Sequence, residues 1–428
     1  MGNIQSISYF FPELVLTATV VVALIADLVY SDRNSYKVGY LVIAGLAIAS
    51  LALWLSPPDE TTPIFLNTIV VDPFSRIFKF VFLLATFFVI LMSINSDELK
   101  SVRTGEYYTL MAVMVLGMSL MASSVDLIMV YLSIEVVSIV SFILAGYLRA
   151  QVRSNEAALK YVIYGAFSSG LMLYGLSLLY GLTGTTKLFE LSGAISSLGP
   201  GSNLTLTVAT ILIMAGFGYK VAMVPFHFWT PDVYEGAPTP VTAYLSVAPK
   251  AAGFALLIRF FNTLFGTGQP LNSPVWQAME GVPWQDVIMV LAAVTMTVGN
   301  LVAIQQQNIK RLLAYSSIAH AGYILMGVPV LSQDGVYAII FYIIVYLFMQ
   351  LGAFFLAIVV SNKYGTEAIE EYSGIGWKSP YLGFFMAVFM FSLTGIPPTA
   401  GFIGKMYLFA ALINGGSQFY WLAIIGVL

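Results

Sequence analysis

Four lysines lie inside long apolar stretches of this sequence, and they are the residues best suited to chemistry. They are Lys160, Lys220, Lys250 and Lys405. If these stretches are membrane helices, a lysine at a helix centre costs about 2.5–3.5 kcal/mol. Glu135 is the one acid well inside such a stretch, so it cannot neutralise four lysines. Because burial favours the neutral form of an amine, we expect these side chains to take up and release protons.

The alternative is that each lysine forms a quiet ion pair or extends to the membrane surface. This alternative fits Lys160 best, because Lys160 lies only a few residues inside its stretch. His320 lies in the middle of a stretch, and we expect it to relay protons because imidazole titrates near neutral pH. His227 follows a proline interruption, where a structural role and proton transfer are equally open.

Polar residues recur at helical spacing in five of the stretches, which predicts continuous polar helix faces. They are Tyr131, Glu135 and Ser138; Lys160, Tyr164 and Ser168; Thr242, Ser246, Lys250 and Gly253; Ser316, His320 and Tyr323; and Tyr342, Tyr346 and Gln350. An isolated polar residue in a membrane helix usually serves helix packing. Five such faces favour a hydrated path across a helix bundle.

The composition places these residues in a polytopic membrane protein. Of the 428 residues, 59% are hydrophobic and 9% are charged, which is far from the composition of a soluble domain. Nucleic acid would need a basic stripe that this sequence lacks. The absence of cysteine excludes disulfides, thiolate metal sites and cysteine-held iron–sulfur clusters. With two histidines and no tight carboxylate cluster, we expect no bound metal and no other cofactor in this chain.

Apolar windows of about 20 residues predict the membrane spans. They are 12–30, 38–55, 73–94, 106–123, 127–148, 156–180, 204–235, 238–265, 284–305, 309–331, 335–361 and 378–415, with an onset at 418–428. The first run lacks a basic leader region, so we expect a span and not a cleaved signal. The last run is too short to cross a bilayer, so we expect the C-terminus to be truncated.

Basic residues predict the orientation, because cytoplasmic loops are enriched in them. Ten fall in loops on one side: Arg33, Lys37, Lys100, Arg103, Arg149, Arg153, Lys310, Arg311, Lys363 and Lys378. Only Lys187 lies in a loop on the other side, so the N-terminus is expected outside. Arg76, Lys79 and Arg259 lie near outer helix ends, where we expect them to snorkel.

Two predicted spans are interrupted by proline, the seventh at Pro225 and the twelfth at Pro397 and Pro398. Because they are five spans apart, they cross in opposite directions, as in inverted-repeat transporters. We therefore expect an all-α polytopic membrane protein built from two inverted five-helix units with discontinuous helices 7 and 12. The predicted parts are three N-terminal helices in 1–105, the first unit in 106–265 and the second unit in 284–428.

Three long segments resemble the antiporter-like subunits of respiratory complex I. They are VPFHFWTPDVYEGAPTPVTAYLSVAPKAAGFA, KRLLAYSSIAHAGY, which contains His320, and SLTGIPPTAGFIGKMYLF. FPELVL, DPFSRIFK and SNEAALKYVIYGAFSSG resemble the N-type subunit in particular. Lys405 also matches the N-type, because the M-type carries a glutamate at this position.

The resemblance implies a role for each buried charge. Glu135 would be the partner of Lys220, and Lys160 would modulate that pair. Lys250 would be the central lysine of the path and Lys405 the terminal one.

The same resemblance implies a non-redox, proton-translocating subunit of NADH:quinone oxidoreductase. NADH, FMN, iron–sulfur clusters and quinone would be held by other subunits. The partners would be neighbouring antiporter-like and small helical membrane subunits and the lipid bilayer, in a bacterial inner membrane, with no nucleic acid. The alternatives are a subunit of a multisubunit cation/proton antiporter or of a related membrane-bound hydrogenase, and a mainly structural scaffold.

Overall fold

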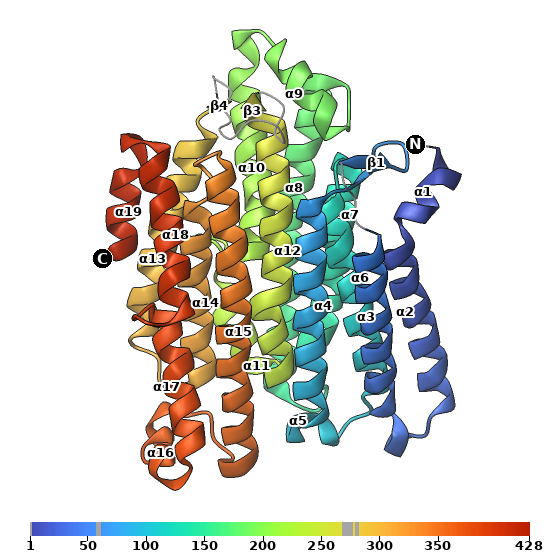
Figure 1. The fold of residues 1–428 in the computed structure, drawn as a ribbon, viewed down its shortest axis with the longest axis vertical. Helices are drawn as coiled ribbons and strands as arrows, with labels where there is room; N and C mark the ends of the chain where they lie inside the picture. The colour runs from blue at the N-terminus through green and yellow to red at the C-terminus, as the bar shows by residue number, and fades with distance from the viewer. Residues whose placement is uncertain (1, 57–60, 268–276, 279–281) are drawn as a thin grey trace. The chain divides into compact units, whose positions relative to one another are not determined.

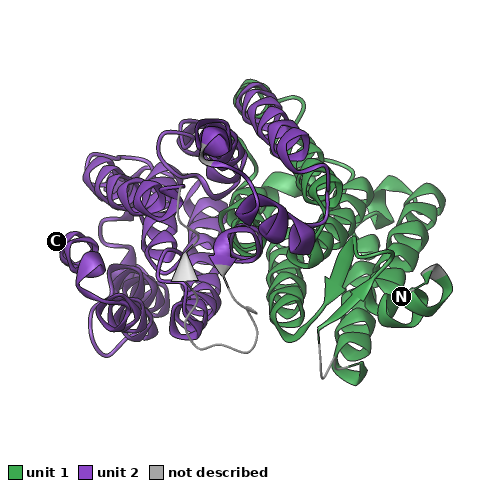
Figure 2. Cartoon of the chain, turned by 90° about the horizontal axis from the view of Figure 1, so that it is seen from above, with its two compact units in different colours: residues 1–162, 236–256 green, residues 163–235, 257–428 purple. Residues whose placement is uncertain are grey.

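The computed structural model describes residues 2–56, 61–267, 277–278 and 282–428. Figure 1 follows the chain from α1 to α19, and nearly all of it is helical. The chain forms two compact units, coloured separately in Figure 2: residues 1–162 with 236–256, and residues 163–235 with 257–428.

Ten helices of the described residues are long and apolar enough to cross a membrane. They are α2 (Phe11–Val29), α3 (Lys37–Leu55), α4 (Pro73–Ile94), α6 (Gly105–Ser123), α7 (Leu127–Ala145), α8 (Val152–Thr183), α10 (Asn203–Val221), α12 (Thr239–Phe265), α13 (Trp284–Ala303) and α15 (Gln333–Tyr364). The more polar α14 (Ile309–Met326) and the apolar helices α17 (Pro380–Thr394), α18 (Ala400–Gly415) and α19 (Tyr420–Val427) complete the predicted order. Ten of the predicted spans are confirmed as helices of span length, with ends that differ by a few residues. Helices α14, α17 and α18 lie at the remaining predicted positions, but taken singly they are too polar or too short for a span.

Shorter elements connect these helices. They are α1 (Asn3–Tyr9), α5 (Asp97–Lys100), α9 (Leu188–Ser196), α11 (Trp229–Gly236), α16 (Ile375–Lys378), the strands β1 (Thr62–Ile64), β2 (Ile69–Val71), β3 (Gly266–Thr267) and β4 (Gln277–Ala278), and the 3-10 turns η1 (Asp32–Asn34), η2 (Pro200–Ser202), η3 (Ile369–Tyr372) and η4 (Ser417–Phe419). The antiparallel β1–β2 hairpin pairs Thr62 with Val71 and leads into α4. At the start of α4, Asp72 and Ser75 form a reciprocal capping box ahead of the first turn. Windows sized for membrane helices cannot detect a hairpin this short.

The first interruption separates α10 from α11. Helix α10 ends at Val221, where Ala222 adopts a left-handed conformation with φ +61°. The Ala222 N–H donates to the Tyr219 carbonyl at 3.2 Å, and the Met223 N–H donates to the Gly218 carbonyl at 2.8 Å. Pro225 follows within the non-helical link, so the helix ends before the proline and not at it. This is the expected result of a left-handed cap and of the extended backbone that proline imposes on the residue before it.

The second interruption, between α17 and α18, repeats this arrangement. Gly395 has φ +84°, its N–H donates to the Ser392 carbonyl at 3.2 Å, and the Ile396 N–H donates to the Phe391 carbonyl at 3.1 Å. A proline joined by a cis peptide bond stands three residues after the left-handed residue in both interruptions, Pro225 in one and Pro398 after Pro397 in the other. The predicted breaks are therefore present and share one backbone design. The inverted relation of two five-helix units stays a prediction.

Gly395 generates the first testable prediction. A side chain there would adopt a left-handed conformation that costs about 1–2 kcal/mol, and its Cβ would lie 3.0 Å from Cδ of Lys405. Gly395→Ala should therefore lower the temperature at which the solubilised complex loses half its activity. The control is Gly170→Ala in α8, where a Cβ meets nothing within 4 Å and helix propensity improves. Equal temperatures for the two variants would contradict the prediction.

Candidate functional site

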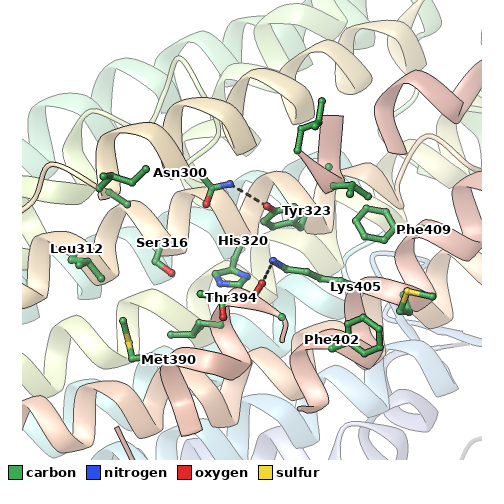
Figure 3. A pocket seen from close by; sticks show the side chains of 18 residues that line it. Asn300, Leu312, Ser316, His320, Tyr323, Met390, Thr394, Phe402, Lys405 and Phe409 are labelled. Carbon is green, nitrogen blue, oxygen red and sulfur yellow. Dashed lines mark hydrogen bonds between the residues drawn. The ribbon is translucent and has the colours of Figure 1, made fainter. Parts of the chain in front are cut away.

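Lys405 joins the two halves of the second broken helix. Its Nζ donates a hydrogen bond to the Thr394 carbonyl at 3.1 Å and lies 4.2 Å from the ring centroid of Tyr323 (Figure 3). Thr394 is the last residue of α17, and carbonyls at a helix C-terminus lack intrahelical partners and carry the negative end of the helix dipole. The break therefore supplies contacts for the ammonium group of Lys405, with the ring face adding a cation–π contact.

His320 lies on α14 one turn before Tyr323, and 3% of it is exposed. Its Nδ1 lies 2.7 Å from the Tyr342 hydroxyl on α15, and its ring centroid is 5.1 Å from that of Tyr346. On the next turn of α15, Gln350 donates to the Leu313 carbonyl at 3.3 Å. The predicted polar faces of α14 and α15 therefore face each other.

A cavity of about 680 Å³ adjoins these side chains. Its polar wall is formed by Asn300, Ser316, His320, Tyr323, Thr394 and Lys405 (Figure 3). Asn300 donates to the Tyr323 hydroxyl at 3.0 Å, which fixes the ring against Lys405. Since one water occupies about 30 Å³ of liquid, this half-open pocket has room for waters beside His320 and Lys405. The structure thus brings two of the predicted site residues to one cavity.

Lys220 and Lys250 are the most deeply buried of the predicted lysines, with 2% and 3% exposed. Lys220 lies in the last turn of α10, two residues before left-handed Ala222. Lys250 directly follows Pro249 inside α12. Pro249 has no N–H to donate to the carbonyl four residues earlier, and the left-handed cap at Ala222 ends α10. Each of the two lysines therefore lies next to an interruption in the helical hydrogen bonding.

Glu135 is half-buried in α7, with its predicted neighbour Ser138 buried one turn further on. Lys160 differs from the other lysines, because its side chain is 37% exposed and pairs with Glu156 at 2.8 Å. This surface pairing, one turn apart on α8, is the alternative that the sequence left open for Lys160. Such exposed pairs contribute little stability.

The first break is completed by residues that the sequence analysis missed. Trp229 at the start of α11 donates from Nε1 to the Tyr219 carbonyl at 3.1 Å, and the Val224 N–H donates to Thr295 Oγ1 at 3.0 Å. His227, which lies between Val224 and Trp229 in the sequence, is buried, and its ring packs against that of Phe228. A tryptophan just after a proline break in an apolar run was the available signal, since indole N–H groups need acceptors when buried.

Lys79 corrects the sequence analysis. Instead of snorkelling, its side chain is 6% exposed and its Nζ lies 2.7 Å from the carboxylate of Glu13 in α2. The capping box at Asp72 fixes where α4 starts and so which way Lys79 points. The signal was present, because Glu13 and Lys79 belong to the FPELVL and DPFSRIFK segments, but neither residue lies deep enough in its span to attract notice.

The comparisons with known proteins first define the class. The family described as NADH:quinone oxidoreductase/Mrp antiporter, TM, matches residues 124–428. In fold, a chain of the Mrp complex from Dietzia sp. DQ12-45-1b is similar, with a TM-score of 0.82 and 24% identity over 100% of this chain and 78% of that one. The fold is thus that of an antiporter-like membrane subunit.

Higher identities define the family. NADH-quinone oxidoreductase subunit N 2 of Chloroherpeton thalassium is 48% identical over 98% of this chain and 82% of its own length. A chain of respiratory complex I from Thermus thermophilus is 31% identical over 97% of this chain and 87% of that one, with a TM-score of 0.75. The chain belongs to the subunit N family of NADH-quinone oxidoreductases, the membrane subunits of complex I that lie among other membrane subunits. The resemblance found in the sequence is confirmed.

The Glu13–Lys79 pair generates a second prediction. Removing one partner leaves an unpaired buried charge, which typically costs about 3–5 kcal/mol, whereas an apolar pair of similar volume is often neutral. Lys79→Met alone should therefore reduce the amount of chain in assembled complex, and adding Glu13→Gln should restore it. The measurement is the chain's abundance in the complex on native gels. If the double variant is no better than Lys79→Met, the pair does not act as a unit.

Proposed function

We propose that this subunit moves protons across the membrane along a path of ionisable side chains within its helices. The path comprises Glu135, Lys160, Lys220, Lys250, His320 and Lys405. The observation that carries the proposal is the placement of amines where helices are interrupted, with Lys405 and His320 on one cavity large enough for water. At such sites burial favours the neutral amine and a nearby carboxylate favours the ammonium form, so the balance between them controls whether the amine holds a proton.

The interplay of Glu135 and Lys220 is the proposed switch. While Glu135 is close and ionised, it favours the ammonium form of Lys220. When this influence weakens, burial favours the neutral amine, and the proton moves to Lys250 and on towards His320 and Lys405. Lys160, whose exposed side chain is paired with Glu156, modulates the interaction between Glu135 and Lys220.

In this proposal the chain holds no redox cofactor. NADH, FMN, iron–sulfur clusters and quinone belong to other subunits of the complex, and their reaction drives proton transfer through conformational and electrostatic coupling. The chain would lie in a bacterial inner membrane with its N-terminus outside, because most loop lysines and arginines fall on one side. The two inverted five-helix units, 106–265 and 284–428, would each carry one interrupted helix.

A second candidate is cation/proton exchange, which the likeness in fold to an Mrp complex favours. Sodium prefers a cluster of oxygen ligands. Among the described residues, no three acidic or histidine side chains converge in a way that could hold a metal ion. A scaffold without transport is the third candidate, and it predicts that the buried charges can be neutralised without effect on proton pumping. A subunit of a hydrogenase-type complex would be separated from complex I by the partners that co-purify.

The first test is Lys220→Ala in the assembled complex. Proton pumping per NADH oxidised should fall by the share that this subunit contributes, because the variant loses a group proposed to carry the proton. It is measured by dye quenching in inside-out vesicles. The control is Lys100→Ala in α5, whose side chain is 66% exposed and should pump normally. Undiminished pumping by the Lys220 variant at normal electron flux would rule out its central role.

The second test replaces sodium by potassium in the vesicle assay. Because amines carry the proton in the proposed path and no sodium site is needed, proton pumping should be unchanged. The measurement is the initial rate of acidification at equal NADH oxidation. A rate that depends on sodium, with uptake of labelled sodium, would favour the antiporter candidate instead.

A further inference from the structure

A short loop helix reaches the start of the helix that carries Lys250. Glu98 lies in α5, between α4 and α6, and both of its carboxylate oxygens contact Thr239, the first residue of α12. Oε2 accepts from the Thr239 backbone N–H and Oε1 accepts from the Thr239 hydroxyl, each at 2.7 Å. Thr239 is 2% exposed, so water does not compete freely for these bonds.

The position of Glu98 has a clear electrostatic reason. The first N–H groups of a helix have no intrahelical partner, and the next residue, Pro240, has no N–H to satisfy. A carboxylate at this end also meets the positive end of the dipole of a 27-residue helix. Charge-assisted bonds of this kind are about twice as strong as neutral ones. Glu98 thus caps α12 from a different part of the chain.

Two further contacts fix the same end of α12. Tyr244 shares a hydrogen bond with Thr86 of α4, with 2.7 Å between their hydroxyl oxygens. Just before α12, Gly236 passes so close to α8 that an added Cβ would lie 2.4 Å from the Arg153 carbonyl. The first turns of α12 therefore cannot slide along their axis while these contacts hold.

The loop that carries Glu98 is also tied to the N-terminal helices. Arg103, at the end of this loop, contacts the carboxylates of Asp27 at 3.1 Å and Asp32 at 3.0 Å, and it also bonds the Asp27 carbonyl. The Thr104 N–H donates to the hydroxyl of Ser35 at 3.2 Å. One continuous loop thus connects the ends of α2 and α3 to the beginning of α12.

We propose that Glu98 is a positioning residue for Lys250, which sets the height of α12 in the membrane and links it to the three N-terminal helices. Lys250 follows Thr239 by 11 residues, or about 16 Å along the helix. A shift of one residue's rise would move the amine by about 1.5 Å, and misplacements of this size are costly for proton transfer. The inference rests on the proposed role of Lys250 in the proton path.

The test compares four variants in the assembled complex. Glu98→Ala removes both bonds to Thr239, whereas Glu98→Gln can keep them, with its oxygen accepting from the N–H and its amide donating to the hydroxyl. The control is Asp97→Asn, in the same short helix but with a side chain 52% exposed. Lys250→Ala reports on the proton path itself. Each variant is measured for abundance in the complex and for protons pumped per NADH.

We expect Glu98→Ala to lower protons pumped per NADH towards the value measured for Lys250→Ala. Glu98→Gln should recover most of this loss, and Asp97→Asn should match the unaltered complex. Hydrogen exchange of the amides in 239–245 should speed up by about tenfold in Glu98→Ala, the effect of losing a hydrogen bond to a charged group on local opening. This readout does not depend on activity.

Three results would overturn the inference. One is normal pumping per NADH in Glu98→Ala while Lys250→Ala is defective, which would leave the proposed path intact. Another is a lower abundance of assembled complex in Glu98→Ala, while the complex that remains pumps normally and hydrogen exchange in 239–245 is unchanged. Glu98 would then serve stability alone. If Lys250→Ala itself pumps normally, the proposed path fails and this inference fails with it.

Discussion

The structure depends on one constraint: a polar group at membrane depth must find its partner within the protein, because lipid offers none. Regular helices satisfy their own backbone, and the two interruptions cannot. Each interruption closes its first half with the same pair of backbone bonds around a left-handed residue, Ala222 or Gly395. The remaining groups go to side chains, such as the indole of Trp229 and the amine of Lys405. An interruption is therefore a place where polar and charged side chains are required.

This constraint explains why the buried lysines and the breaks occur together. An ammonium group needs several acceptors, and the end of a helix offers carbonyls without intrahelical partners. Lys405 takes the Thr394 carbonyl, Lys220 stands two residues before Ala222, and Lys250 follows a proline inside α12. For Lys405, the Thr394 carbonyl and the ring face of Tyr323 hold the amine in place. Lys79, by contrast, is held by the carboxylate of Glu13.

The sequence was informative where one pattern has one physical cause. Apolar runs of span length, and prolines within them, predicted the order of helices and both breaks, because lipid permits few solutions. Where two arrangements of a side chain have similar free energies, the sequence did not distinguish between them. Lys79 and Arg76 both lie near a helix end, yet Lys79 turns inward to Glu13 while Arg76 bonds the Trp54 carbonyl. The difference depends on which helix packs alongside. The β1–β2 hairpin and the cap from Glu98 join residues far apart in sequence, and no local period encodes them.

The contact between Glu98 and the start of α12 illustrates what such long-range polar contacts achieve. Buried ion pairs seldom add net stability over a well-packed apolar pair, because desolvation offsets much of their attraction. A directional polar contact, however, permits one register only. The carboxylate of Glu98, which accepts from both the N–H and the hydroxyl of Thr239, cannot do so if α12 moves by one residue. Apolar surfaces slide more easily, and α12 is buried along its length. In the proposed role of Glu98, this directional polar contact at one end of α12 specifies the position that hydrophobic packing leaves undetermined.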